Sequence, residues 1–150
     1  MPASAEPKTV FSGVFRHSVD ANRRVQMPFR WRGRKRLEFN LILWPQHDAG
    51  PCLRVLPPDE MEKLRQKVDA MPTAEKTAVK RHIGTYSTRI ELDSANRIGI
   101  PEELAVQAGI GDQAVFAGML DYFELWNPNT YAEMSALEKV TVKAAIKGLE

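Results

Sequence analysis

The sequence has one cysteine among its 150 residues, Cys52, and no long run of apolar residues. A single cysteine excludes an internal disulfide and any metal site built from several thiolates, and its apolar neighbours predict a buried thiol. No stretch approaches the roughly 18 apolar residues that span a bilayer, and the first residues lack the pattern of a secretory signal. We therefore expect a cytoplasmic protein that makes no contact with a membrane.

Residues with the chemistry of an active site are also scarce. His17, His47 and His82 have no partners at metal-ligand spacing. No pair of nucleophile and base, phosphate-binding loop or dinucleotide motif is present. We therefore expect a protein that is not an enzyme and that uses neither a metal nor a cofactor.

Basic residues are absent from residues 101–134, although this segment contains six acidic ones. The opposite holds between Lys8 and Arg36, where nine basic residues accompany one acid, Asp20. The net charge of +2 therefore hides a separation of charge along the chain. A positive region attracts anions such as the phosphates of nucleic acid, and a negative one can dock against a positive neighbour. A solvated surface with uneven charge is the alternative.

One short unit occurs twice. Residues 20–28 read DANRRVQMP and residues 93–101 read DSANRIGIP, so each copy has an Asp, three residues, an Arg and then alternating apolar residues up to a Pro. The motif aspartates lie 73 residues apart, whereas Pro58 and Pro128, which follow similar apolar segments, lie 70 apart. Such an internal duplication predicts pseudo-twofold symmetry.

Each motif predicts a β-hairpin with a short turn, because apolar and polar residues alternate on both sides of it. The last turn position is Asn96 in the second copy, and asparagine tolerates a left-handed backbone. Arg23 occupies this position in the first copy, so we expect that turn to be strained or shifted by one residue. Asp20 and Asp93 are expected to hold the turns by accepting N–H groups or by orienting an arginine.

Four helices are expected outside the hairpins. One covers about residues 59–71, with Asp59 and Glu62 as a capping box at its start. A linking helix is expected at 73–82, a short one at 101–108 that ends before Gly109, and a last one at about 129–146. Together with the strands, these helices predict a β-rich α+β fold.

Trp126 and Trp31 are expected to differ in burial. Trp126 lies in an apolar segment, which favours a core position. Trp31 stands between Arg30 and Arg32, which favours an exposed ring.

The two motifs belong to a longer set of sequence signals: FSG at residues 11–13, SVD at 18–20, AGI at 108–110 and YFELW at 122–126. Together these signals resemble the MraZ family over about residues 10–135. The resemblance implies two tandem AbrB-like (SpoVT-AbrB) β-hairpin domains, interlocked as an intramolecular pseudo-dimer with flanking helices. The first would span residues 10–72 with its helix, the second residues 87–150 with the C-terminal helix, and residues 73–86 would connect them.

The resemblance also implies a function. Members of the family regulate transcription of the bacterial cell-division and cell-wall gene cluster, and they bind direct repeats in its promoter as ring-shaped homo-oligomers. We therefore expect a nucleoid-associated repressor whose partners are double-stranded DNA and further copies of itself. The alternative is an antitoxin-like or structural module that uses the same fold to bind a protein.

The expected DNA contacts are arginines on or near the turns. Arginine can make paired hydrogen bonds to phosphate or guanine, and a turn on a rigid sheet can present it to a groove. The alternative role of the motif arginines is an ion pair with the motif aspartate that only stabilises the hairpin. The DNA-binding candidates are Arg16, Arg23, Arg24 and Arg97, and the residues expected to support the hairpins are Asp20, Asn22, Asp93 and Asn96. Further phosphate contacts are expected from Arg30, Arg32, Arg34, Lys35 and Arg36.

Overall fold

A computed structural model describes residues 8–33, 37–45 and 47–150, and the predicted β-rich α+β fold is confirmed. The strands are β1 Val14–Ser18, β2 Arg24–Gln26, β3 Glu38–Trp44, β4 Cys52–Leu56, β5 Ser87–Glu91, β6 Arg97–Gly99, β7 Gln113–Gly118 and β8 Phe123–Trp126. The α-helices are α1 Pro58–Asp69, α2 Thr73–Thr85, α3 Glu102–Gln107 and α4 Pro128–Ala145, and the 3-10 helices are η1 Phe29–Trp31 and η2 Ile146–Leu149. No helix in these ranges is long and apolar enough to cross a membrane.

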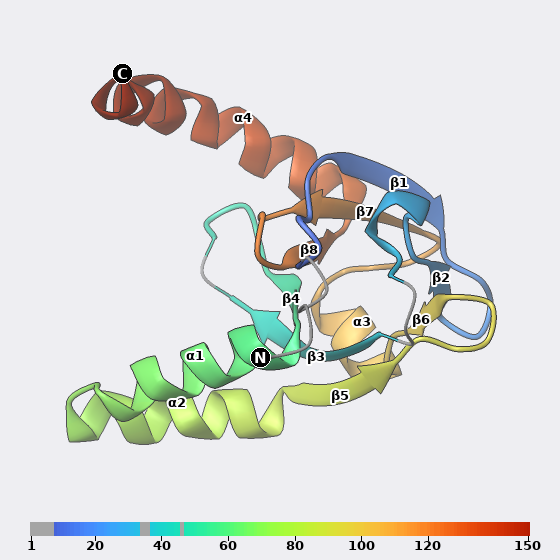
Figure 1. Ribbon diagram of the computed structural model, residues 1–150, viewed down its shortest axis with the longest axis horizontal. Helices are drawn as coiled ribbons and strands as arrows, with labels where there is room; N and C mark the ends of the chain where they lie inside the picture. The colour runs from blue at the N-terminus through green and yellow to red at the C-terminus, as the bar shows by residue number, and fades with distance from the viewer. Residues whose placement is uncertain (1–7, 34–36, 46) are drawn as a thin grey trace, which may run out of the picture.

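Six strands form an antiparallel sheet in the order β1-β7-β8-β4-β3-β5, and β2 and β6 form a separate two-stranded ribbon. The helices α1 and α2 lie side by side as one arm, and α4 forms a second arm (Figure 1). Both arms project on the side of the molecule that lies away from the ribbon (Figure 1). The ribbon is therefore left uncovered by these helices.

Strand pairing follows the sequence repeat. In the ribbon, Val25 pairs with Ile98, and these residues lie 73 apart, as the motif aspartates do. In the sheet, Arg54 pairs with Glu124, and these lie 70 apart, as the two helix-starting prolines do. Equivalent strands also take equivalent places, with β1 and β5 at the edges and β8 and β4 at the centre. The pairing is thus pseudo-symmetric about the Val25–Ile98 and Arg54–Glu124 pairs.

The hairpin prediction was only partly right. The chain does reverse at the first motif, where a single bridge joins Val19 and Val25. Beyond that bridge the strands on either side of the turn separate, because β1 pairs with β7 and β2 pairs with β6. Alternation of apolar residues shows which face of a strand is buried but does not identify its neighbour.

The core fills the space between the sheet and the ribbon. Val25 and Ile98, on the inner face of the ribbon, are 1% and 0% exposed. Cys52 and Trp126 are buried as predicted, in a second, smaller cluster with Met134 of α4. Burial, with Glu124 nearby, raises the pKa of the Cys52 thiol far above its ordinary value, so the thiolate is not formed near neutral pH.

The expected exposure of Trp31 was wrong, since its side chain is only 1% exposed. Its ring packs edge-on against Phe11 and Phe15, with centroids 5.5 and 5.2 Å away, and its indole N–H donates to the carbonyl of Ser12 at 3.0 Å. Phe29, two residues earlier, is the exposed aromatic at 80%. The short η1 helix turns Trp31 inward while the neighbouring arginines remain at the surface.

The predicted helices are present, but the capping box of α1 was wrong. The helix begins at Pro58, after Pro57, with no side-chain cap. Proline suits the first helical position because its missing N–H would lack a partner there. Asp59 forms an ion pair with Lys8 at 2.9 Å instead.

Candidate nucleic-acid interface

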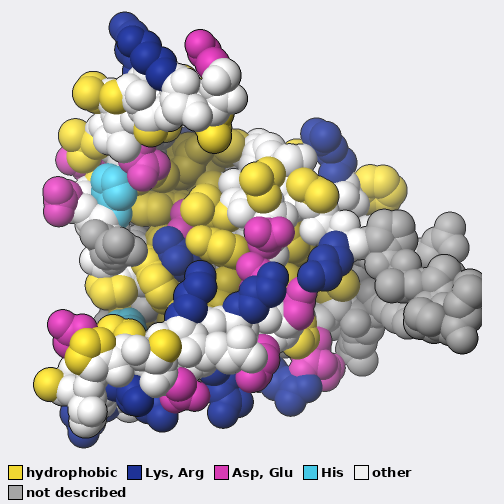
Figure 2. Space-filling view, turned by 60° about the vertical axis from the view of Figure 1, so that its left-hand side comes forward, with side chains coloured by type: hydrophobic (Ala, Val, Ile, Leu, Met, Phe, Trp, Pro, Cys, Tyr) yellow, Lys and Arg dark blue, Asp and Glu magenta, His cyan; other side chains and the backbone are white. Residues whose placement is uncertain are grey.

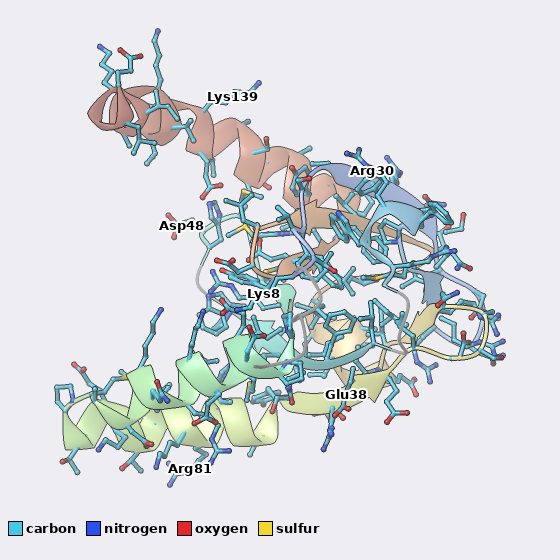
Figure 3. The ribbon with its side chains drawn as sticks, in the orientation of Figure 1. Lys8, Arg30, Glu38, Asp48, Arg81 and Lys139 are labelled. Carbon is cyan, nitrogen blue, oxygen red and sulfur yellow. The ribbon has the colours of Figure 1, made fainter. Side chains whose placement is uncertain are left out.

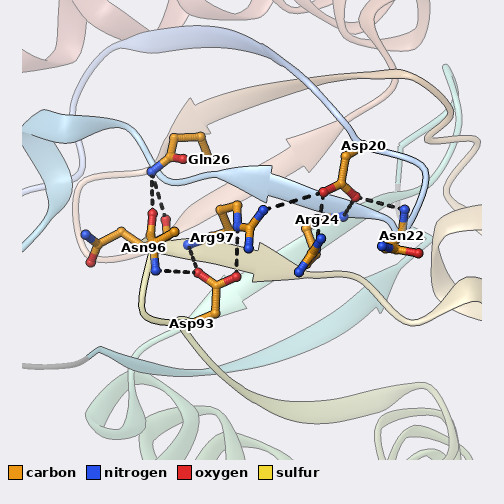
Figure 4. A network of polar contacts seen from close by, with 8 residues as sticks. Asp20, Asn22, Arg24, Gln26, Asp93, Asn96 and Arg97 are labelled. Carbon is orange, nitrogen blue, oxygen red and sulfur yellow. Dashed lines mark hydrogen bonds and ion pairs between the residues drawn. The ribbon is translucent and has the colours of Figure 1, made fainter.

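The first motif turn is held by one carboxylate (Figure 4). Asp20 Oδ1 accepts hydrogen bonds from the backbone N–H groups of Asn22 and Arg24, both at 2.9 Å. Arg23 lies between them with a φ of 58°, in the left-handed region. The turn is therefore strained at Arg23, as one alternative predicted, and the same residue positions form the turn in both copies.

The second turn repeats this geometry. Asp93 Oδ1 accepts from the N–H groups of Ala95 and Arg97, both at 2.9 Å. Asn96 has a φ of 59°, within one degree of the arginine that takes its place in the first turn. Both carboxylates thus make the hydrogen bonds expected of a turn-supporting aspartate.

Each motif arginine is also held by its aspartate. Arg24 Nε lies 3.2 Å from Asp20 Oδ2, and Arg97 Nε lies 2.8 Å from Asp93 Oδ2. A longer contact of 3.8 Å joins Arg97 Nη1 to Asp20 Oδ2 and links the two turns. The arginine side chains remain 38% and 32% exposed, so they are oriented by the protein while still meeting solvent.

The ribbon places both arginines on one surface. Val25 and Ile98 face the core, so the alternating residues Arg24, Gln26 and Arg97 lie on the opposite face. Gln26 Nε2 donates to the carbonyl of Ala95 at 2.8 Å and so braces the second turn. We call this surface, the solvent-facing side of residues 20–26 and 93–99, the ribbon face.

The other predicted contact residues differ in how they are held. Arg16 is exposed on β1, and its Nε donates to Gln113 Oε1 at 3.3 Å. Arg30 is exposed on η1 (Figure 3), and the next residue, Trp31, packs against Phe15 of β1. Arg32 donates from Nε and Nη2 to the carbonyl of Met27, at 3.0 and 2.8 Å, and so supports the chain after the ribbon. Arg34, Lys35 and Arg36 lie outside the described residues.

Two polar side chains, one on the ribbon and one on β5, were not singled out in the sequence. Gln26 was read only as part of the alternating pattern, although it connects the two turns. Arg89 is the repeat counterpart of Arg16, 73 residues later, and it forms an ion pair with Glu38. Applying the repeat offset to every charged residue would have identified Arg89.

Hydrogen bonding to the turns lowers the pKa of both motif carboxyl groups. For Asp20 the largest cause is the backbone N–H of Arg24, and for Asp93 it is the backbone N–H of Arg97. Because each carboxylate binds a proton less readily in the folded chain than in the unfolded one, its contribution to stability is complete above about pH 4. That contribution is lost as the pH falls through the lowered pKa.

We therefore expect the double variant Asp20→Asn/Asp93→Asn to depend less on acid pH than the unchanged protein. Both proteins would be melted at several pH values between about pH 7 and pH 2.5, followed by circular dichroism. The unchanged protein should have the higher Tm at neutral pH, and the difference should shrink below about pH 4 because protonation removes the same charges. A difference that stays constant across this range would contradict the role given to the carboxylates.

The other side of the sheet is hollowed between the two helical arms. Figure 2 shows hydrophobic side chains on the floor of this hollow, which encloses a cavity of about 470 Å³. At its base Arg54 Nε lies 3.0 Å from Glu124 Oε2, and the guanidinium lies over the Trp44 ring at 4.0 Å. Within the described residues no buried side-chain polar atom lacks a partner, and no cluster suited to a metal ion occurs. The ribbon face, by contrast, presents two solvent-exposed arginines that are oriented by carboxylates, which makes it our candidate site.

Comparison with known proteins gives one consistent result. The family model described as "MraZ protein, putative antitoxin-like" matches residues 85–144. The chain is 31% identical over 137 residues to a protein of Pseudomonas putida (strain GB-1), covering 89% of the chain and 91% of the relative. It is 29% identical to proteins of Leuconostoc citreum (strain KM20) and Thermomicrobium roseum, covering 85% of the chain and 87% and 89% of these relatives. All three relatives are named "Transcriptional regulator MraZ".

Proposed function

The chain belongs to the MraZ family, and we therefore propose that it is a transcriptional regulator that binds double-stranded DNA through the ribbon face. The observation that carries this proposal is the pair of arginines, Arg24 and Arg97, each oriented by an aspartate on the outer face of the ribbon. A two-stranded ribbon fits the major groove, which is about 12 Å wide, and arginine can read guanine there by paired hydrogen bonds. The buried inner face holds the ribbon rigidly to the core.

The halves of the chain form two interlocked AbrB-like domains in this proposal, residues 10–72 and 87–150, connected by residues 73–86. The pseudo-symmetric pairing of Val25 with Ile98 and of Arg54 with Glu124 supports this division. In this arrangement each half supplies one strand of the ribbon and one of its two turns.

Self-association as a ring is the second part of the proposal, and the arm α4 supports it. The apolar residues Leu137, Val140 and Val142 of α4 are at least 50% exposed, and so is Ile146 at the start of η2. The hollow beside this arm offers further apolar surface (Figure 2). A ring that meets several direct repeats in a promoter would multiply weak contacts by avidity. The proposed target is the cell-division and cell-wall gene cluster, and the proposed effect is repression at the nucleoid.

The second candidate function is an antitoxin-like or protein-binding module. The description of the matching family includes the words "putative antitoxin-like", and the hollow between the arms could hold a protein segment. Such a module would use the arms rather than the ribbon face. Binding measurements with DNA separate the two candidates.

We expect the protein to bind the DNA just upstream of its own gene at least about tenfold more tightly than a scrambled duplex of equal length. Fluorescence anisotropy titrations at two salt concentrations measure both affinities. Each phosphate contact should add about −0.9 to the slope of log K against log salt, so several contacts give a steep slope. Equal and feeble binding to both duplexes would contradict the proposal and favour a protein partner.

A further inference from the structure

The two turns share one backbone but present different side chains. Arg23 and Asn96 have φ values of 58° and 59°, and both aspartates accept the same pair of backbone hydrogen bonds. The pairing of β2 with β6 also relates the turns symmetrically. Any difference in what the turns bind must therefore come from their side chains.

The first difference is charge. Residues 16–24 contain three arginines and one acid, whereas the equivalent residues 89–97 contain two arginines and two acids. The nearby partners increase this difference, because Arg16 donates to the neutral amide of Gln113 while Arg89 is paired with the carboxylate of Glu38. The first turn therefore has an excess of positive charge that the second turn lacks.

The motif arginines are also held unequally. Arg97 lies within 4.0 Å of two carboxylates, Asp93 at 2.8 Å and Asp20 at 3.8 Å. Among the described residues Arg24 has one such partner, Asp20, at 3.2 Å. A guanidinium shared between two carboxylates attracts a phosphate less strongly than one with a single carboxylate. The first turn is thus also the better anion site at the matching position.

Arg23 has a strained backbone conformation, and its side chain lies at the end of the ribbon. A left-handed backbone is unfavourable for an ordinary residue and less so for asparagine, so Asn would fit this turn better than Arg. The Arg23 Nε donates to the carbonyl of Ile100 at 3.2 Å, which directs the side chain across the end of the ribbon. Residues held in strained conformations gather at functional sites, and here the strained residue adds a charge.

We infer that the two turns contact DNA unequally, with the first turn as the dominant contact and Arg23 as the residue that sets the difference. One chain would then recognise a DNA site that has a direction, rather than a palindrome, despite its pseudo-symmetry. This inference rests on the proposed DNA binding by the ribbon face.

The test uses the full chain, its upstream DNA and three variants. Arg23→Asn gives the first turn the residue of the second, and it should weaken binding about fivefold and reduce the magnitude of the salt slope by about 0.9. Its Tm should equal or exceed that of the unchanged protein, because asparagine relieves the strain. Arg16→Ala and Arg89→Ala form a symmetry-matched pair, of which Arg16→Ala should weaken binding about threefold and Arg89→Ala by less than about twofold.

Footprints give the direction of the site. On the upstream fragment, Arg23→Asn should lose backbone protection on one side of each bound site. Unchanged affinity of Arg23→Asn, equal losses for Arg16→Ala and Arg89→Ala, or symmetric loss of protection would each overturn the inference while leaving DNA binding intact. If the unchanged protein itself shows no preference for the upstream DNA, the proposed function fails and the inference fails with it.

Discussion

Replacing Arg24 by alanine is expected to weaken binding to the upstream DNA by roughly 5- to 150-fold. One bidentate arginine contact to a base contributes about 1–3 kcal/mol of discrimination, which corresponds to this range. Arg24 is oriented by Asp20 on the outer face of the ribbon. Within the described part of the chain it has one carboxylate partner where Arg97 has two, so its positive charge is the less neutralised of the two. In a multivalent assembly the loss recurs in every subunit, which places the result toward the upper end. Anisotropy titration against the upstream and scrambled duplexes measures it.

The turn itself should survive this substitution, because Asp20 Oδ1 still accepts two backbone hydrogen bonds. Arg24→Lys distinguishes a base contact from a phosphate contact, since lysine keeps the positive charge but lacks the planar guanidinium that makes paired hydrogen bonds. A loss close to that of alanine indicates paired hydrogen bonds to a base, and near-normal binding indicates a phosphate contact. Arg81→Ala is the matched control, because Arg81 is exposed on the α2 arm, far from the ribbon face (Figure 3). Normal DNA affinity of Arg24→Ala would mean that Arg24 only stabilises the turn through its ion pair with Asp20.

Much of the local structure could be predicted because it depends on residues close in sequence. The turn needs an acceptor at its first position and a residue that tolerates a left-handed backbone at its fourth, and Asp93 and Asn96 satisfy both requirements. The bounds of α4 were likewise predicted closely, at about residues 129–146 against the observed Pro128–Ala145. The DNA contacts of the ribbon face remain a prediction, because they depend on a partner.

Features that depend on distant residues could not be predicted in the same way. The alternation in residues 97–100 fits any neighbouring strand, and only packing of both halves selects β2 as the partner of β6. The orientation of Trp31 also depends on such packing, because flanking arginines describe the sequence and not the direction of the side chain. Charged neighbours are therefore weak evidence for an exposed aromatic when a single helical turn separates inward from outward positions.

Trp31→Ala is expected to destabilise the protein by about 3–5 kcal/mol, the usual cost of removing a buried tryptophan. The ring fills the space between Phe11, Phe15 and Phe123, and the collapse of this site is limited because side chains of β1, β7 and β8 surround it. For a chain of this size the loss corresponds to a decrease in Tm of roughly 6–20 °C. Chemical denaturation followed by circular dichroism measures the free energy of unfolding.

Two variants make this prediction specific to the buried ring. Phe29→Ala removes an aromatic two residues away that is 80% exposed, and it should change stability by less than about 0.5 kcal/mol. Trp31→Phe keeps most of the packing but loses the hydrogen bond to Ser12, so about 1–2 kcal/mol should be lost. Because only Met27 and Pro28 separate η1 from β2, a loosened Trp31 should also release the ribbon from the core and reduce DNA affinity. Equal, small effects of Trp31→Ala and Phe29→Ala would show that Trp31 is exposed in solution, as its neighbours in the sequence suggest.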